Sequence, residues 1–152
     1  MKEKTKKIIL LIIICLFTIG ILFITLKLNE QRKKEILSTS SIDGYLTEIK
    51  YDEVQTHIVE QPNSIIYISN SSDDVSRDFE KDFKKVIKKY NLENEIIYIN
   101  INNVNIIDPV YQYAPTLIFY SKGQISDIID CETLKTKKQI IDILEERSVI
   151  ND

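Results

Sequence analysis

Apolar residues follow three different patterns along this chain, and each pattern predicts a different kind of element. Residues 8–26 form a run of nineteen positions without a charge. Residues 65–68 and 96–99 are short continuous apolar runs, typical of strands that are covered on both faces of a sheet. Residues 75–90 place apolar side chains three or four positions apart, which predicts a single stripe on an amphipathic helix. The sequence therefore combines a hydrophobic span with an α/β domain.

The run at residues 8–26 has the length and composition of a transmembrane helix. At ~1.5 Å per residue it would reach ~28 Å, close to the thickness of a hydrocarbon core. Cleaved signal peptides have shorter apolar regions of ~7–15 residues and a small-x-small cleavage site, and no such site follows this run. Cys15 follows three isoleucines rather than small residues, which does not fit a lipidation site. We predict an uncleaved, single-pass anchor.

The orientation of this anchor depends on the basic residues that flank it. Four lysines or arginines lie on each side, so the positive-inside rule alone gives no decision. The N-terminal group lies closer to the span and is opposed only by Glu3, which favours a cytoplasmic N-terminus. We therefore predict a protein of the cell membrane with a cytoplasmic basic tail (1–7), an anchor (8–26), a juxtamembrane tether (27–44) and an extracellular domain (45–150).

Charge is distributed unevenly between the two parts of the chain. Residues 1–35 carry a net charge of +5, whereas residues 36–152 carry −8. An acidic domain lacks the electrostatic footprint of a nucleic-acid-binding protein, so nucleic acid is not an expected partner. The basic residues 32–34 instead predict a stop signal and a contact with lipid headgroups.

The part of the chain after the tether predicts alternating strands and helices. Strand–helix–strand units pair their strands in parallel through right-handed crossovers, whereas a closing hairpin is antiparallel. We expect an α/β sandwich with a mixed central sheet. The expected elements are strands at 45–50, 64–69, 95–101, 116–120 and 125–129, helices at 51–60, 75–90 and 136–147, and a loop or short degenerate helix at 102–112.

The hairpin carries the most specific motif. Pro115 stands at the start of its first strand, where the missing N–H costs no ladder bond and a cis bond costs little. The stretch Ala-Pro-Thr-Leu-Ile-Phe-Tyr-Ser-Lys-Gly-Gln-Ile (114–125) resembles the cis-proline hairpin of the thioredoxin superfamily. With the element order, the resemblance covers residues 45–147. Among members of this superfamily, the chain is similar to the small membrane-tethered accessory proteins of bacterial bacteriocin export.

The resemblance implies a site at the start of the long helix. There the family has a Cys-x-x-Cys pair, whose first thiol has a lowered pKa. These two positions fall on Asp73 and Ser76, give or take one residue, and neither forms a disulfide. Dithiol oxidoreductase activity is thus excluded, and ordinary helix capping is the simplest interpretation of Asp73. The family also binds extended peptides beside the cis-proline. The peptide-binding residues that this implies are Ser72, Asp73, Ser76, Ala114, Pro115 and Cys131.

Other chemistry has little support in the sequence. Cys131 is the only cysteine outside the span, and it has two interpretations: a small buried residue, or an exposed thiol that forms a mixed disulfide. His57 is the only histidine, so we expect no metal site. Three glycines cannot build a glycine-rich phosphate loop, and we expect no cofactor.

Three functional hypotheses remain open. The first is a redox-inactive domain that binds or escorts a secreted peptide or a partner protein without covalent chemistry. The second is a monothiol thiol-disulfide enzyme that uses Cys131. The third is a structural accessory subunit of a peptide exporter.

Overall fold

The computed structural model describes residues 2–151, apart from the side chains of residues 35 and 36. It divides into two compact units, Met1–Ile36 and Leu37–Asp152. We describe each unit by itself.

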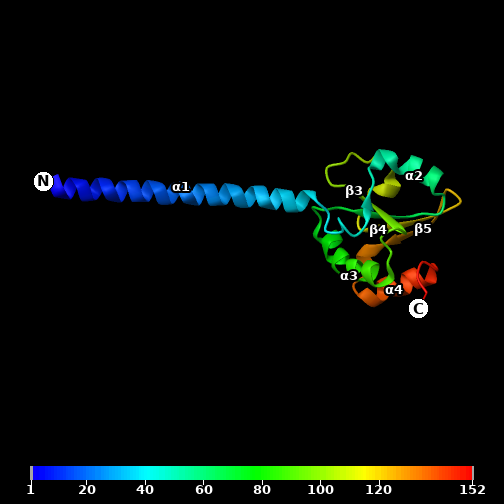
Figure 1. Ribbon diagram of the computed structural model, residues 1–152. Coiled ribbons are helices and arrows are strands. Elements are labelled where there is room, and N and C mark those ends of the chain that lie inside the picture. Colours follow the sequence, from blue (N-terminus) through cyan, green and yellow to red (C-terminus); the bar gives the residue numbers. More distant parts are fainter. Residues whose placement is uncertain (1, 152) are drawn as a thin grey trace. The chain divides into compact units, whose positions relative to one another are not determined.

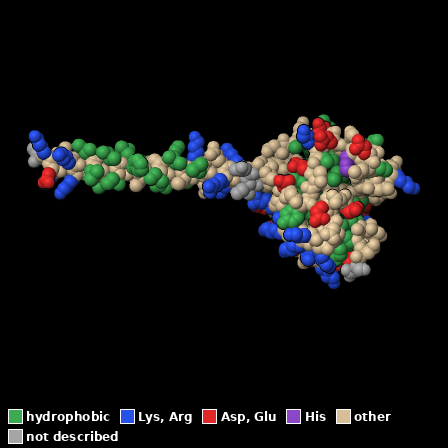
Figure 2. All heavy atoms as spheres, in the orientation of Figure 1, with side chains coloured by type: hydrophobic (Ala, Val, Ile, Leu, Met, Phe, Trp, Pro, Cys, Tyr) green, Lys and Arg blue, Asp and Glu red, His purple; other side chains and the backbone are tan. Residues whose placement is uncertain are grey.

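The first unit consists of helix α1 (Lys2–Ser38) up to Ile36, and the last two residues of the helix belong to the second unit. Hydrophobic side chains surround the middle of this helix, and basic side chains gather on either side of them (Figure 2). It is the one helix among residues 2–151 that is long and apolar enough to cross a membrane, and its apolar window of 18 residues has a mean hydropathy of 3.2. The hydroxyls of Thr18 and Thr25 donate to the carbonyls of Cys15 (2.9 Å) and Leu22 (2.8 Å). Both hydroxyls are therefore satisfied within the helix, as an apolar surrounding requires.

The second unit is built on a five-stranded mixed sheet in the order β1-β3-β2-β4-β5 (Figure 1). β1 and β2 pair in parallel with β3, while β4 pairs antiparallel with both β2 and β5. The predicted combination of parallel first strands and an antiparallel closing hairpin is confirmed. The strands are β1 (Thr47–Glu48), β2 (Ile65–Ser69), β3 (Ile96–Asn100), β4 (Thr116–Ser121) and β5 (Gln124–Asp130).

Two helices cover one face of the sheet and one short helix covers the other (Figure 1). α3 (Asp74–Tyr90) and α4 (Lys137–Glu146) pack on the first face, and α2 (Val54–Glu60) packs on the second. The apolar stripe predicted for the long helix is confirmed, since its buried residues include Phe79, Phe83, Val86 and Ile87.

The connection from β3 to β4 contains no α-helix. Residues 101–115 form a loop whose only helical turn is the 3₁₀ turn η2 (Pro109–Tyr111), as the sequence predicted. The α2 face of the sheet is consequently incompletely covered near β5. Ile128 pairs with the buried Ile118 and shares its face, yet Ile128 remains 46% exposed.

Candidate functional site

The N-terminus of α3 is capped by the side chain of Asp73. Asp73 is the N-cap residue, and its carboxylate accepts hydrogen bonds from the Ser76 N–H (2.8 Å) and the Ser76 hydroxyl (3.1 Å). Ser76 is fully buried and Ser72 is exposed. An acidic N-cap satisfies an orphan donor and complements the helix dipole. The capping interpretation of Asp73 therefore accounts for its geometry.

The proline loop presents an unpaired stretch of backbone. The Ala114–Pro115 bond is cis, and the Pro115 carbonyl accepts from the Cys131 N–H (3.0 Å). Ala114 is half-buried, and its backbone N–H and C=O form no hydrogen bond with any other described residue. Tyr113, which precedes it, is 72% exposed. Backbone donors and acceptors of this kind are what an added peptide strand pairs with.

Cys131 lies behind this loop and is buried. Its side chain is 1% exposed, and its thiol donates to the Ile129 carbonyl at 3.5 Å. Burial raises the pKa of the thiol well above its usual range. Cys131 is therefore a neutral and shielded thiol, which is the opposite of what a nucleophilic cysteine needs.

A hollow of about 490 Å³ opens beside the proline loop on the α2 side of the sheet. Ala114 and Thr116 contribute to its wall, and Ile128 of β5 contributes to its floor. Two exposed acidic residues, Asp130 and Glu132, complete the rim. The remaining lining residues are Pro109, Val110 and Tyr113. We call this space the loop hollow.

A second hollow, of about 250 Å³, lies between α3 and the segment that follows β5. Cys131 and Glu132 line it together with Asp78, Asp82 and Lys135. Lys81 pairs with Asp78 at 2.6 Å and lowers the pKa of that carboxyl. The other lining residues are Val75, Phe79 and Leu134.

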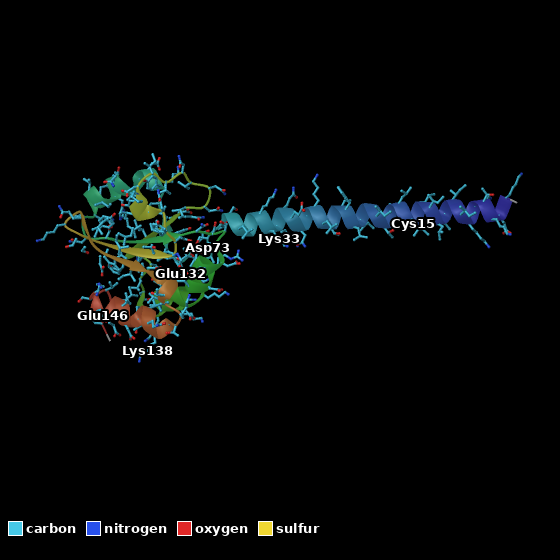
Figure 3. All side chains as sticks on the ribbon, turned by 180° about the vertical axis from the view of Figure 1, so that it is seen from behind. Cys15, Lys33, Asp73, Glu132, Lys138 and Glu146 are labelled. Atoms are coloured by element: carbon cyan, nitrogen blue, oxygen red, sulfur yellow. The ribbon has the colours of Figure 1, made fainter. Side chains whose placement is uncertain are left out.

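The residues that the resemblance implied are divided between separate environments. Ala114 lines the loop hollow and Cys131 the second hollow. The remaining four line neither hollow: Ser72, Asp73, Ser76 and Pro115. Figure 3 shows Asp73 at the start of α3 and Glu132 on the segment after β5. The loop hollow is the part of this end that combines open volume with unpaired backbone.

A buried carboxyl group, which the sequence reasoning missed, lies at the same end of the sheet. Glu80 is fully buried on α3 and accepts hydrogen bonds from four hydroxyls. They belong to Ser40 (3.0 Å), Tyr67 (3.1 Å), Ser69 (2.6 Å) and Ser41. Burial, and next the proximity of Glu80, raise the pKa of the Tyr67 phenol. The available signal was a single acidic residue within the apolar stripe of the helix.

The segment that leads into the domain, residues 37–42, is bound at the same place; we call it the entry segment. The Leu37 carbonyl accepts from the Ser71 hydroxyl (2.6 Å) and from the Asn102 side-chain amide (2.9 Å). The Asn100 amide donates to the Ser38 carbonyl at 3.2 Å. The entry segment is thus fixed at the C-terminal ends of β2 and β3.

No metal centre emerges from the part of the chain that the structure describes, because no cluster of three or more His, Cys, Asp or Glu side chains occurs there. His57 is half-buried on α2, and its Nε2 atom has no hydrogen-bond partner among the described residues.

Comparison with known proteins identifies the fold. Thioredoxin f2 of Chlamydomonas reinhardtii superposes with a TM-score of 0.55 at 12% identity, covering 70% of this chain and 99% of that protein. Mitochondrial thioredoxin 3 of Saccharomyces cerevisiae, in its oxidized form, superposes with a TM-score of 0.51 at 12% identity, covering 66% and 94%. No protein-family model and no curated protein sequence matches the chain. The domain therefore has a thioredoxin-like fold, preceded by one candidate membrane-spanning helix.

Proposed function

We propose that this protein is anchored in the cell membrane by α1 and binds extended peptide segments at its cis-proline loop, without dithiol chemistry. The observation that carries the proposal is the backbone of Ala114, which is unpaired within the described structure and lies on the wall of the loop hollow. A peptide strand that pairs with this backbone would place one of its side chains in the hollow, because alternate side chains of a strand point to opposite sides.

The start of α3 supports a non-covalent role. Where the thioredoxin superfamily has a thiolate, this helix has the Asp73 carboxylate, which accepts hydrogen bonds from Ser76 in the first turn of α3. The one cysteine of the domain, Cys131, is buried with a raised pKa, which disfavours the monothiol alternative. Binding at the loop therefore needs no bond to sulfur.

The basic residues before the span support an extracellular domain, and the partner that we propose is a secreted peptide or a protein of its export machinery. The narrower role of a bacteriocin-export accessory protein rests on the sequence resemblance alone. It would make the loop a holding site for a peptide that has crossed the membrane.

Peptide binding is tested with the full chain in phosphatidylcholine nanodiscs and carboxymethylated insulin B chain as an unfolded, thiol-blocked probe. We expect the probe to slow amide hydrogen exchange in residues 112–118 and to leave residues 84–90 of α3 unchanged. Ala114→Phe should fill the hollow and abolish the protection, whereas the matched control Ala114→Ser should retain it. Equal protection in both variants, or none in the wild-type chain, would refute the proposal.

A further inference from the structure

We propose that the loop hollow selects extended peptide segments in which a lysine or arginine lies two positions from an apolar residue, so that both side chains point to the same side of the peptide strand. The inference rests on the proposed function and adds the chemical class of the ligand. It is carried by three features of the hollow: an apolar floor, two carboxyl groups without cationic partners and the unpaired backbone of Ala114.

The apolar floor is exposed because the β3–β4 connection forms no α-helix that would cover it. Ile128 shares a face with Ile118, which is fully buried, but Ile128 is itself 46% exposed and lines the hollow. Pro109 and Val110 of η2 form the adjoining wall. A volume of about 490 Å³ accommodates more than one large side chain, and an exposed apolar floor with a polar rim is typical of a binding surface.

The rim is acidic. Asp130 and Glu132 are exposed, and neither forms an ion pair with any residue in the range 2–151. One oxygen of Asp130 accepts from the Glu132 N–H at 2.9 Å, which holds this carboxylate in place at the end of β5. The hollow is lined by no lysine or arginine. A cationic peptide side chain would thus meet two carboxylates, and an anionic one would be repelled by both.

The three features together set the geometry of the ligand. Backbone pairing at Ala114 makes the peptide extended, and the floor near Ile128 accepts an apolar side chain. Asp130 follows Ile128 by two positions on the same face of β5, so a cationic side chain of the peptide would lie beside the acidic rim. The net charge of −8 on residues 36–152 favours the same ligand during encounter.

The test uses the full chain in uncharged phosphatidylcholine nanodiscs and two fluorescein-labelled peptides of the composition Gly-Ser-Val-Phe-X-Val-Ser-Gly, with X as Lys or Glu. Fluorescence anisotropy measures the affinities at 50 and 500 mM salt. We expect the Lys peptide to bind about tenfold more tightly than the Glu peptide at low salt, with a smaller difference at high salt.

Three variants identify the source of this preference. The double substitution Asp130→Asn and Glu132→Gln should remove the preference for the Lys peptide. Asn at position 130 retains the oxygen that accepts from the Glu132 N–H. The double substitution Glu93→Gln and Glu95→Gln makes the same change in net charge before β3 and should leave the preference intact. Ile128→Ser should weaken the binding of both peptides.

The outcomes separate this inference from the proposed function. Equal binding of both peptides that is lost in Ile128→Ser would overturn the cationic preference and leave peptide binding at the loop intact. A Lys preference that survives the Asp130/Glu132 double substitution would place the selective charges elsewhere and also overturn the inference. Binding of neither peptide, together with no protection by insulin B chain, would overturn both proposals.

Discussion

Replacement of Glu80 by alanine tests how strongly the buried hydroxyl cluster stabilises this end of the domain. The carboxyl group accepts four hydrogen bonds, three of them at Oε1 from Ser40, Tyr67 and Ser69. With a net value of about 1 kcal/mol for each bond, their loss amounts to about 4 kcal/mol. The hydroxyl oxygens of Ser40 and Ser69 lie 2.7 Å apart, so once Glu80 is removed one hydroxyl can donate to the other, which recovers part of this energy. We therefore expect Glu80→Ala to cost about 3–4 kcal/mol, a large effect of the kind that follows when a buried hydrogen-bond network is broken.

Glu80→Gln separates the effect of shape from the effect of the second oxygen. Glutamine has the same size and keeps one carbonyl oxygen for the three donors at Oε1. Only the bond from Ser41 must reverse its direction. A cost of about 1–2 kcal/mol is expected. Glu146→Ala, an exposed position on α4, serves as the control and should stay within about 0.5 kcal/mol.

Guanidinium unfolding of the full chain in detergent micelles measures these costs. Because the chain has no tryptophan and eight tyrosines, near-ultraviolet circular dichroism of the tyrosines reports on the packed core. A loss of 3–4 kcal/mol should lower the midpoint by about 1 M. A cost below about 1 kcal/mol for Glu80→Ala, or equal costs for alanine and glutamine, would refute the reasoning.

Three further predictions concern titration, reactivity and topology. Burial raises the pKa of four phenols, those of Tyr67, Tyr98, Tyr111 and Tyr120. They remain protonated in the folded state, whereas they ionise near pH 10 in the unfolded chain. Their contribution to stability is therefore present below that pH, and the free energy of unfolding falls above it by up to about 1.4 kcal/mol per pH unit for each phenol. Absorbance at 295 nm should show their ionisation only together with unfolding, and a single native transition of all eight tyrosines would contradict this. In a Cys15→Ser background, a membrane-impermeant maleimide should modify Cys131 only after denaturant is added, and rapid labelling of the native protein would contradict its burial. With both native cysteines replaced by serine, cysteine at Lys138 should react with this maleimide on intact cells and cysteine at Lys4 should not; the reverse would place the domain in the cytoplasm.

The elements with strong local patterns were predictable from the sequence. The continuous apolar runs that became β2 and β3 have almost no polar position, so each had to lie inside a sheet with both faces covered. The stripe on α3 and the turn at Gly123 are likewise local signals, and Gly123 takes a φ of 75° that favours glycine. Each of these segments contains the information for its own conformation.

The contacts of the hydroxyl cluster were not predictable in this way. Ser40 and Ser41 lie in a polar stretch without periodicity, and Glu80 alone gave no indication of its partners. The bonds join residues that are 11 to 40 positions apart, so they exist only once the sheet and α3 are packed. The loop hollow was not predictable either. It arises where the β3–β4 connection lacks an α-helix, and the absence of a helix produces no sequence motif that would indicate a hollow.

The N-terminus of α3 is occupied by a carboxylate of the chain itself. A helix N-terminus favours a negative charge, and here the Asp73 carboxylate supplies it, accepting hydrogen bonds of 2.8 and 3.1 Å from Ser76 of the same helix. A ligand that approached this point would have to displace an internal cap. The backbone of Ala114 and the carboxylate of Glu132 have no such competitor among the described residues, and the Asp130 carboxylate accepts only from the Glu132 N–H, through one of its two oxygens. Recognition at this end should therefore depend on the proline loop and β5, and substitution of Asp73 should alter the stability of α3 more than the affinity for a peptide.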